Sequence, residues 1–188
     1  MNALIIILAV LIVAAVLLVI WMIATYNGFI RLKNKIDEAW AAMDVSLKKR
    51  WDLVPNVVET VKGYAKHESE TLAKVTAARN SAFSAATPGE RIQKDQELTE
   101  SLHSLFALSE SYPDLKASAG FQGLQEQLSR MEEEIAGSRR YYNAVVNRFN
   151  TKLEMFPGNI IGGICGFERR PLYELKEDKE REAVKVSF

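Results

Sequence analysis

The sequence is poor in the residues that build disulfide frameworks and metal sites. Its 188 residues include one cysteine, Cys165, and two histidines, His67 and His103. A single cysteine excludes a disulfide within the chain, and these three side chains are too few for a zinc cage built from such ligands. His67 and Glu68 lack the second histidine of an HExxH helix. The residues therefore predict no catalytic centre, no metal site and no cofactor.

The sequence also lacks an excess of either charge. Lysine and arginine total 24, aspartate and glutamate total 24, and the formal net charge is zero. Nucleic-acid-binding domains carry a basic excess, so the composition does not predict a nucleic-acid partner. The charges are unevenly distributed, because residues 1–30 contain none.

An unbroken apolar run fills most of this uncharged region. It covers 22 residues, from Ala3 through Leu11 to Ala24. A helix of that length crosses a hydrocarbon core of ~30 Å while satisfying its own backbone hydrogen bonds. The run is longer than the apolar region of a signal peptide, and no lysine or arginine precedes it. We predict an uncleaved transmembrane anchor over residues 1–28, with a cleaved signal peptide as the alternative.

The charges that flank the anchor predict its direction. Arg31, Lys33 and Lys35 follow the apolar run, whereas no basic side chain precedes it. Positive flanking residues are retained on the cytoplasmic side. We therefore expect the N-terminus outside and the body in the cytoplasm, with an extracytoplasmic body as the alternative.

Residues 29–156 show the three- and four-residue spacing of amphipathic helices. We expect a first helix that ends near Leu53, because Pro55 disfavours helical geometry in the residue before it. A second helix then runs from Pro55 to about Ala86. The capping signal Thr87-Pro88-Gly89-Glu90 begins a third helix, which ends at Tyr112-Pro113.

The fourth helix has the clearest pattern, a seam whose spacings alternate between three and four residues. The seam is formed by Phe121, Leu124, Leu128, Met131, Ile135, Ser138, Tyr142, Val145 and Phe149. Short connections make neighbouring helices antiparallel. The sequence therefore predicts an all-α protein, with an N-terminal transmembrane helix followed by an elongated antiparallel four-helix bundle over residues 29–156.

Residues 157–188 form a third region without a helical pattern. The segment 157–171 is rich in glycine and contains four apolar side chains, Ile160, Ile161, Ile164 and Phe167. This strip could cover the end of the bundle, occupy a groove on a neighbouring copy, or touch lipid. The charged tail that follows is typical of a solvated segment.

Two basic clusters, Lys48-Lys49-Arg50 and Arg139-Arg140, are candidate contact sites. Their simplest interpretation is a solvated helix face with ion pairs worth under ~1 kcal/mol each. Their functional interpretation is contact with anionic headgroups or with an acidic surface such as Glu132-Glu133-Glu134, in the same chain or another copy. Asp44 and Arg50 lie among apolar neighbours, so we expect one or both to be partly buried and paired. The candidate residues for self-association or partner contact are Lys48, Lys49, Arg50, Arg139, Arg140, Phe156, Ile160, Ile161 and Phe167.

Several blocks of the sequence closely resemble the LemA family, in order and in separation. They are Tyr26-Asn27, Ala39-Trp40, Asp44-Val45, Lys48-Lys49-Arg50, Asp52-Leu53-Val54-Pro55-Asn56-Val57-Val58, Val61-Lys62-Gly63-Tyr64-Ala65, His67-Glu68, Tyr112-Pro113, Leu115-Lys116-Ala117, Arg139-Arg140, Tyr142-Asn143, Phe149-Asn150, Phe156-Pro157 and Gly166-Phe167. The similarity extends from about residue 26 to residue 167, which is most of the chain.

The resemblance implies a single-pass protein of the bacterial cell membrane with an extended helical bundle and no established enzymatic activity. It also implies the topology expected above, with the N-terminus outside. The magnetosome membrane protein MamQ is a relative, which favours a role in membrane organisation or remodelling. LemA genes often neighbour genes for membrane-stress proteases, which favours an adaptor.

Two functions from different classes follow. The first is a non-catalytic, membrane-anchored scaffold that self-associates to organise or remodel the membrane, with the lipid bilayer and further copies as partners. The alternative is an adaptor or regulator of another membrane protein, such as an envelope-stress protease. An enzyme that uses His67 and Glu68 is the least favoured hypothesis.

Overall fold

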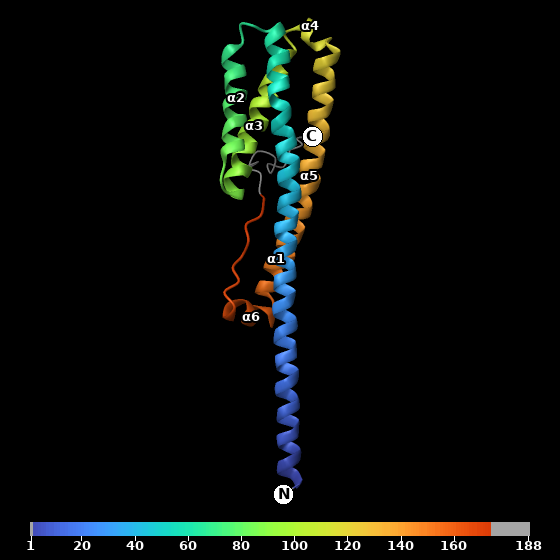
Figure 1. Cartoon of the computed structure of the whole chain (residues 1–188), viewed down its shortest axis with the longest axis vertical. Helices are drawn as coiled ribbons and strands as arrows, with labels where there is room; N and C mark the ends of the chain where they lie inside the picture. The colour runs from blue at the N-terminus through green and yellow to red at the C-terminus, as the bar shows by residue number, and fades with distance from the viewer. Residues whose placement is uncertain (1, 174–188) are drawn as a thin grey trace, which may run out of the picture. The chain divides into compact units, whose positions relative to one another are not determined.

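The computed structural model describes residues 2–173 and is all-α over that range, with no strand (Figure 1). Its helices are α1 (Asn2–Tyr64), α2 (Ser69–Ser84), α3 (Pro88–Ser109), α4 (Pro113–Lys116), α5 (Ala119–Glu154) and α6 (Gly158–Ile164). The prediction of an all-α fold with a long apolar N-terminal helix is confirmed. The predicted charged tail falls on residues 174–188, which lie outside the described residues.

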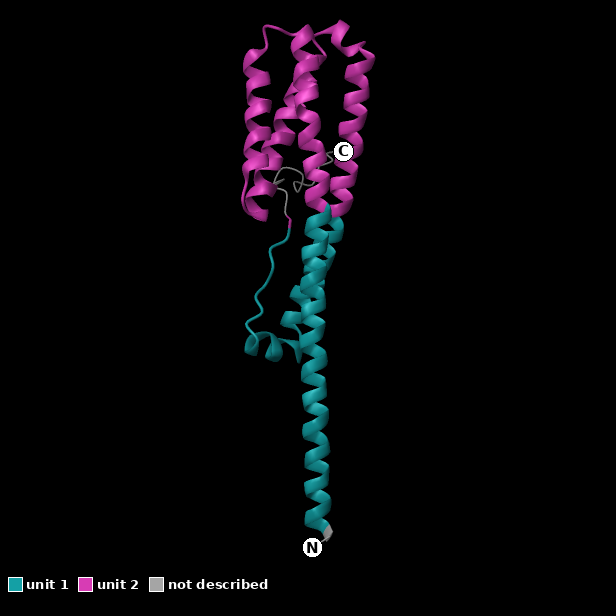
Figure 2. Cartoon of the chain, viewed as in Figure 1, with its two compact units in different colours: residues 1–42, 140–172 teal, residues 43–139, 173–188 magenta. Residues whose placement is uncertain are grey.

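The chain divides into two compact units (Figure 2). Unit 1 comprises residues 1–42 and 140–172, and unit 2 comprises residues 43–139 and 173–188. Helices α1 and α5 each contribute to both units, because the boundaries at residues 42–43 and 139–140 fall inside them. The finer expectation of one four-helix bundle over residues 29–156 stays a prediction.

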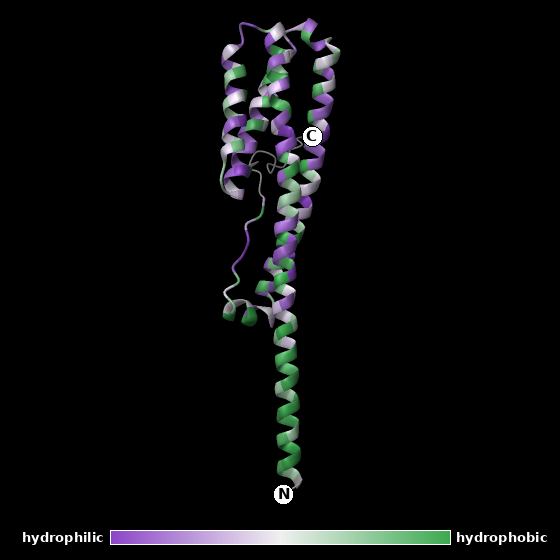
Figure 3. Ribbon diagram, in the orientation of Figure 1, coloured by the Kyte–Doolittle hydropathy of each residue, from purple (hydrophilic) through white to green (hydrophobic). Residues whose placement is uncertain are grey.

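The first part of α1 carries apolar side chains that no other element within residues 2–173 covers. Large apolar residues from Leu4 to Ile20 are 51–73% exposed, and the most apolar window has a mean hydropathy of 3.6 (Figure 3). Fully burying one such side chain is worth about 1.5–3 kcal/mol relative to leaving it in water. The segment is long and apolar enough to cross a membrane.

The predicted break at Pro55 is wrong, because α1 continues through this proline to Tyr64. Proline has no backbone N–H, so in a helix the carbonyl four residues earlier loses its donor. Here that carbonyl belongs to Trp51, and it accepts a hydrogen bond of 3.2 Å from Nε of Arg79 on α2. A side chain from the neighbouring helix thus replaces the missing bond. The helix instead ends before residues 65–68, and α2 begins at Ser69.

The capping box predicted for α3 and the seam predicted for α5 are confirmed, although α3 ends at Ser109, earlier than the predicted end at Tyr112. Thr87 and Glu90 form the expected capping box, in which the Glu90 N–H donates to Thr87 Oγ1 and the Thr87 N–H donates to Glu90 Oε2, both at 3.2 Å. The α5 seam faces inward, with buried side chains at Phe121, Leu128, Ile135, Tyr142, Val145 and Phe149.

The expectation of an irregular segment over residues 157–171 is wrong for Gly158–Ile164, which forms α6. Its glycines permit close packing on α5 rather than breaking the helix. A Cβ on Gly158 would collide with the Lys152 carbonyl, and one on Gly162 would collide with the Leu153 side chain. Local spacing could not show this contact, because it depends on the tertiary approach of α6 to α5.

A double-mutant cycle tests the role of Arg79. We expect Arg79→Met to lower the free energy of unfolding by about 1–3 kcal/mol, because it leaves the Trp51 carbonyl without its donor. In a Pro55→Ala background the helix supplies its own N–H, so the same substitution should cost about 1 kcal/mol less. Chemical denaturation of the full-length protein in detergent, followed by circular dichroism, measures both costs. Equal costs in the two backgrounds would contradict this role.

Candidate functional site

Unit 2 is built around a buried arginine. Arg50 on α1 is 2% exposed, and its guanidinium pairs with Asp95 on α3 and with Glu132 on α5. The Nη1–Oε2 distance to Glu132 is 2.5 Å. Asp95 is 3% exposed and also accepts a 3.0 Å hydrogen bond from Nε1 of Trp51. Buried charges persist only when they are paired, so this cluster ties three helices together.

The first basic cluster is therefore divided between an internal and an external role. Lys48 and Lys49 are exposed, whereas the guanidinium of Arg50 is committed inside the chain. The sequence predicted that Asp44, Arg50 or both would be partly buried and paired, each with some partner. Both are: Asp44 pairs with Arg91 on α3, and Arg50 pairs with Asp95 and Glu132. Lys49 Nζ lies 3.8 Å from Glu134 Oε2. Two carboxylates of the acidic run thus face the basic run of the same chain.

The second basic cluster differs between its two members. Arg139 is half-buried in unit 2, and its guanidinium carbon lies 5.5 Å from the ring centroid of Tyr173, as expected for a cation–π contact. Tyr173 is 4% exposed, and burial raises the pKa of its hydroxyl to about 12, with the charge of Asp95 acting in the same direction. Arg140 belongs to unit 1 and is exposed.

A groove of about 390 Å³ lies beside Arg50 in unit 2. Helices α3 and α5 line it with apolar side chains such as Leu102 and Leu128, together with His103. Within residues 2–173, no three His, Cys, Asp or Glu side chains group as metal ligands would. His67, the other histidine, is exposed in the segment between α1 and α2.

The core of unit 1 is an aromatic cluster next to the apolar run of α1. Phe29 is fully buried and contacts Phe149 and Phe167, with ring centroids 5.8 and 5.0 Å away. Tyr26 contacts the same Phe167 ring at 5.9 Å. Phe167 and Ile161, two of the predicted contact residues, therefore pack inward, and Ile161 is 3% exposed.

Lys152 on α5 contacts this part of α1 through a hydrogen bond and a cation–π contact. Its Nζ donates a 3.3 Å hydrogen bond to the Thr25 carbonyl and lies 4.6 Å from the centroid of the Phe29 ring. Gly28 makes the approach possible, because a Cβ there would collide with Nζ. Burial lowers the pKa of Lys152, and the neighbouring charge of Arg31 lowers it further.

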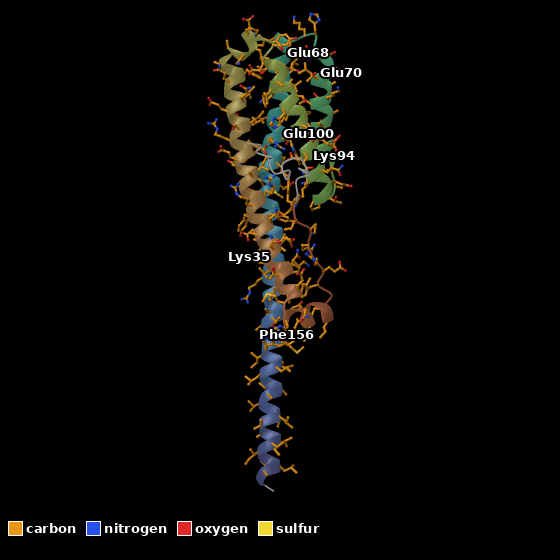
Figure 4. The ribbon with its side chains drawn as sticks, turned by 180° about the vertical axis from the view of Figure 1, so that it is seen from behind. Lys35, Glu68, Glu70, Lys94, Glu100 and Phe156 are labelled. Atoms are coloured by element: carbon orange, nitrogen blue, oxygen red, sulfur yellow. The ribbon has the colours of Figure 1, made fainter. Side chains whose placement is uncertain are left out.

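Four apolar side chains at the same end of unit 1 point outward. Phe156, which Figure 4 labels, is 78% exposed, Ile164 71%, Met155 60% and Ile160 48%. Of the four apolar residues predicted to make contacts, Phe156 and Ile160 are the two that remain exposed. Sequence spacing could not separate them from Ile161 and Phe167.

Sequence reasoning missed three positioning residues: Lys152, Asp95 and Asn150. Asn150 is 5% exposed and binds the backbone of Arg170 through both its amide nitrogen and its oxygen, each at 2.9 Å. The Tyr142 hydroxyl donates to the Pro171 carbonyl at 3.2 Å. These bonds hold the segment after α6 against α5. The available signal was a polar residue directly after Phe149 in the seam.

Comparison with known proteins decides the family. The LemA family model matches residues 39–188. The chain belongs to the LemA family. It is 30% identical to Protein LemA of Metamycoplasma hominis over 139 residues, which cover 72% of this chain. The alignment spans only 62% of that relative's length.

Magnetosome proteins are similar at lower identity. The chain is 24% identical to magnetosome protein MamQ 2 of Paramagnetospirillum magneticum, covering 88% of this chain and 72% of the relative. It is 21% identical to magnetosome protein MamQ of Magnetospirillum gryphiswaldense, covering 86% and 69%. This LemA chain is thus similar, over most of its length, to proteins named as magnetosome proteins.

Arg50 should stabilise unit 2 far more than its exposed neighbour does. We expect Arg50→Met to lower the free energy of unfolding by about 3–5 kcal/mol, because Asp95 is left charged and buried. Lys49→Met is the matched control and should cost under about 1 kcal/mol. Adding Asp95→Asn to Arg50→Met should recover part of the loss. Denaturation of the full-length variants in detergent measures these values, and equal losses for both methionine variants would refute the role given to Arg50.

Tyr173 should make the free energy of unfolding fall as the pH rises above 10. The pKa of its hydroxyl is about 12 in the folded chain and about 10 in the unfolded chain. Above pH 10 the unfolded state releases this proton first, so stability is retained below pH 10 and lost as pH rises toward 12, by about 2–3 kcal/mol. Tyr173→Phe should remove that part of the loss. Unfolding titrations at pH 9 to 11.5 compare the two proteins, and parallel curves would contradict the assignment.

Proposed function

We propose that this LemA protein is a non-catalytic, single-pass protein of the bacterial cell membrane that self-associates to organise or remodel the membrane. The observation that carries the proposal is the continuity of α1. One helix begins as the apolar run and continues without a break into the packed part of unit 1. Lys152 and the aromatic cluster fix α5 and α6 to that helix directly beyond the run. Contacts between the parts of two copies that follow the apolar run would therefore bring their membrane anchors together.

Charge supports a topology with the N-terminus outside and the body in the cytoplasm. Arg31, Lys33 and Lys35 follow the apolar run, and residues 1–30 are uncharged. Basic residues near the end of a span are retained on the cytoplasmic side.

Exposed groups of both signs support self-association. Lys48 and Glu133 in unit 2, and Arg140 in unit 1, present charged side chains to solvent. Contacts between unlike surfaces on successive copies build rings or open lattices. The similarity to MamQ, a magnetosome protein by name, favours an organising role in a membrane.

The mass of the full-length protein tests the proposal. In detergent and in lipid vesicles we expect assemblies of many copies by light scattering and particle imaging. Lys48→Glu combined with Arg140→Glu should shift the mass toward smaller species, and high salt should act in the same direction by screening the charges. The matched control is Lys66→Glu, which reverses an exposed lysine between α1 and α2.

A protein that stays monomeric at high concentration in both media would overturn self-association. Capture of a different membrane protein by such a monomer, after crosslinking in cells, would support the adaptor function instead. A helical protein can serve as an adaptor by presenting a groove to a partner's helix.

A further inference from the structure

Unit 1 contains a groove that opens where the apolar run of α1 ends. Its volume is about 490 Å³, and its walls come from α1, α5 and the start of α6. Trp21 and Thr25 of α1 line one side, and Arg148, Lys152 and Phe156 line the other. Because Trp21 belongs to the apolar run and also lines the groove, the groove is continuous with the membrane-spanning surface.

The level of the groove matches the boundary between hydrocarbon and headgroups. At ~1.5 Å per residue, Trp21 lies about 4 Å inside the end of the run at Ala24, and Phe29 lies about 7 Å beyond it. Each headgroup region of a bilayer is about 5–7 Å deep. Amphipathic aromatic side chains such as Trp21 are enriched at this depth.

The groove joins an apolar wall to a basic wall. Asn147 and Arg148 on α5 line it, as do Thr151 and Lys152 four residues later on the same helical face, and Met155 lines it just beyond the end of α5. Lys152 donates one hydrogen bond, to Thr25, and an ammonium group has three N–H donors. The nearby carboxylate of Glu154 pairs with Arg169 at 3.2 Å and does not line the groove.

Exposed apolar side chains continue from the groove along α6. Phe156, labelled in Figure 4, lies just after the end of α5. Ile160 and Ile164 follow it on α6 and are 48% and 71% exposed. This combination of exposed apolar residues and cations is typical of segments that lie in the membrane interface. In water the apolar side chains have no apolar contact and the cations have no anionic partner. A phospholipid supplies both, through an acyl chain and a phosphate.

We infer that this groove binds one anionic phospholipid of the bilayer. Arg148 and Lys152 contact the phosphate, Asn147 and Thr151 offer further polar contacts, and Trp21, Met155 and Phe156 contact the upper part of an acyl chain. The burial of Lys152 and the nearby charge of Arg31 make an anion at this position favourable. The inference rests on the membrane anchoring in the proposed function and does not require self-association.

Native mass spectrometry of the full-length protein in detergent tests the inference. Phosphatidylglycerol and phosphatidylcholine are added separately, and bound lipids are counted for each chain. We expect one phosphatidylglycerol to be retained about tenfold more tightly than phosphatidylcholine. Arg148→Gln should weaken that retention about fivefold, since one basic side chain near anionic lipid is worth about that factor.

Arg130→Gln is the matched control, because Arg130 is also an exposed arginine of α5. It lies 18 residues before Arg148, which is about five helical turns, so both arginines are on the same face of the helix. Equal retention of the two lipids, or equal effects of the two arginine variants, would overturn the inference. Inorganic phosphate at the same concentration should not displace the lipid, and displacement would assign the groove to a soluble anion instead.

A second pair of variants tests the acyl contact. Phe156→Ala removes a side chain that is 78% exposed, so it should leave the fold intact and lower retention of phosphatidylglycerol severalfold. Tyr141→Ala removes another exposed aromatic of α5 outside the groove and should have no effect. Retention that is unchanged by Phe156→Ala would contradict the acyl contact. Because lipids are counted per chain, a monomer that binds lipid would leave this inference standing even where self-association fails.

Discussion

The apolar surface of the first part of α1, on which no other described element packs, is the constraint on which the rest of the structure depends. More than a dozen large apolar side chains are over half exposed there, and only hydrocarbon is a suitable solvent for such a surface. The helix must then leave the membrane without losing its backbone hydrogen bonds. It does so by continuing as α1 into unit 1, where α5 and α6 pack on it directly beyond the apolar run.

The long helix α1 carries polar groups that hydrogen-bond to side chains of neighbouring helices. The carbonyl freed by Pro55 receives a donor from Arg79, and the buried guanidinium of Arg50 receives carboxylates from α3 and α5. At the membrane-proximal end, Lys152 bonds the Thr25 carbonyl of α1. In each case a side chain from another helix bonds a polar group on α1. Cross-helix bonds of this kind select one packing arrangement, because alternatives would leave buried polar groups unpaired.

What the sequence predicted correctly was local, and what it missed depended on tertiary partners. The capping box at Thr87 and the α5 seam act within one helix, so spacing was enough to find them. The break expected at Pro55 was wrong because the compensating donor lies 28 residues away from Trp51 on another helix. Gly158 and Gly162 indicated an irregular segment, yet they permit α6 to approach α5. Phe156 and Ile161 could not be divided into outward and inward residues without the fold.

The central claim is that copies of this LemA protein associate within the membrane. The chain has a single cysteine, Cys165, and it is exposed on unit 1, so one fluorophore can be attached to each copy at its native position. The most direct measurement counts photobleaching steps per spot for the full-length protein in supported bilayers at low surface density. The account predicts several steps per spot at densities where chance overlap is rare. Spots that bleach in a single step would contradict it.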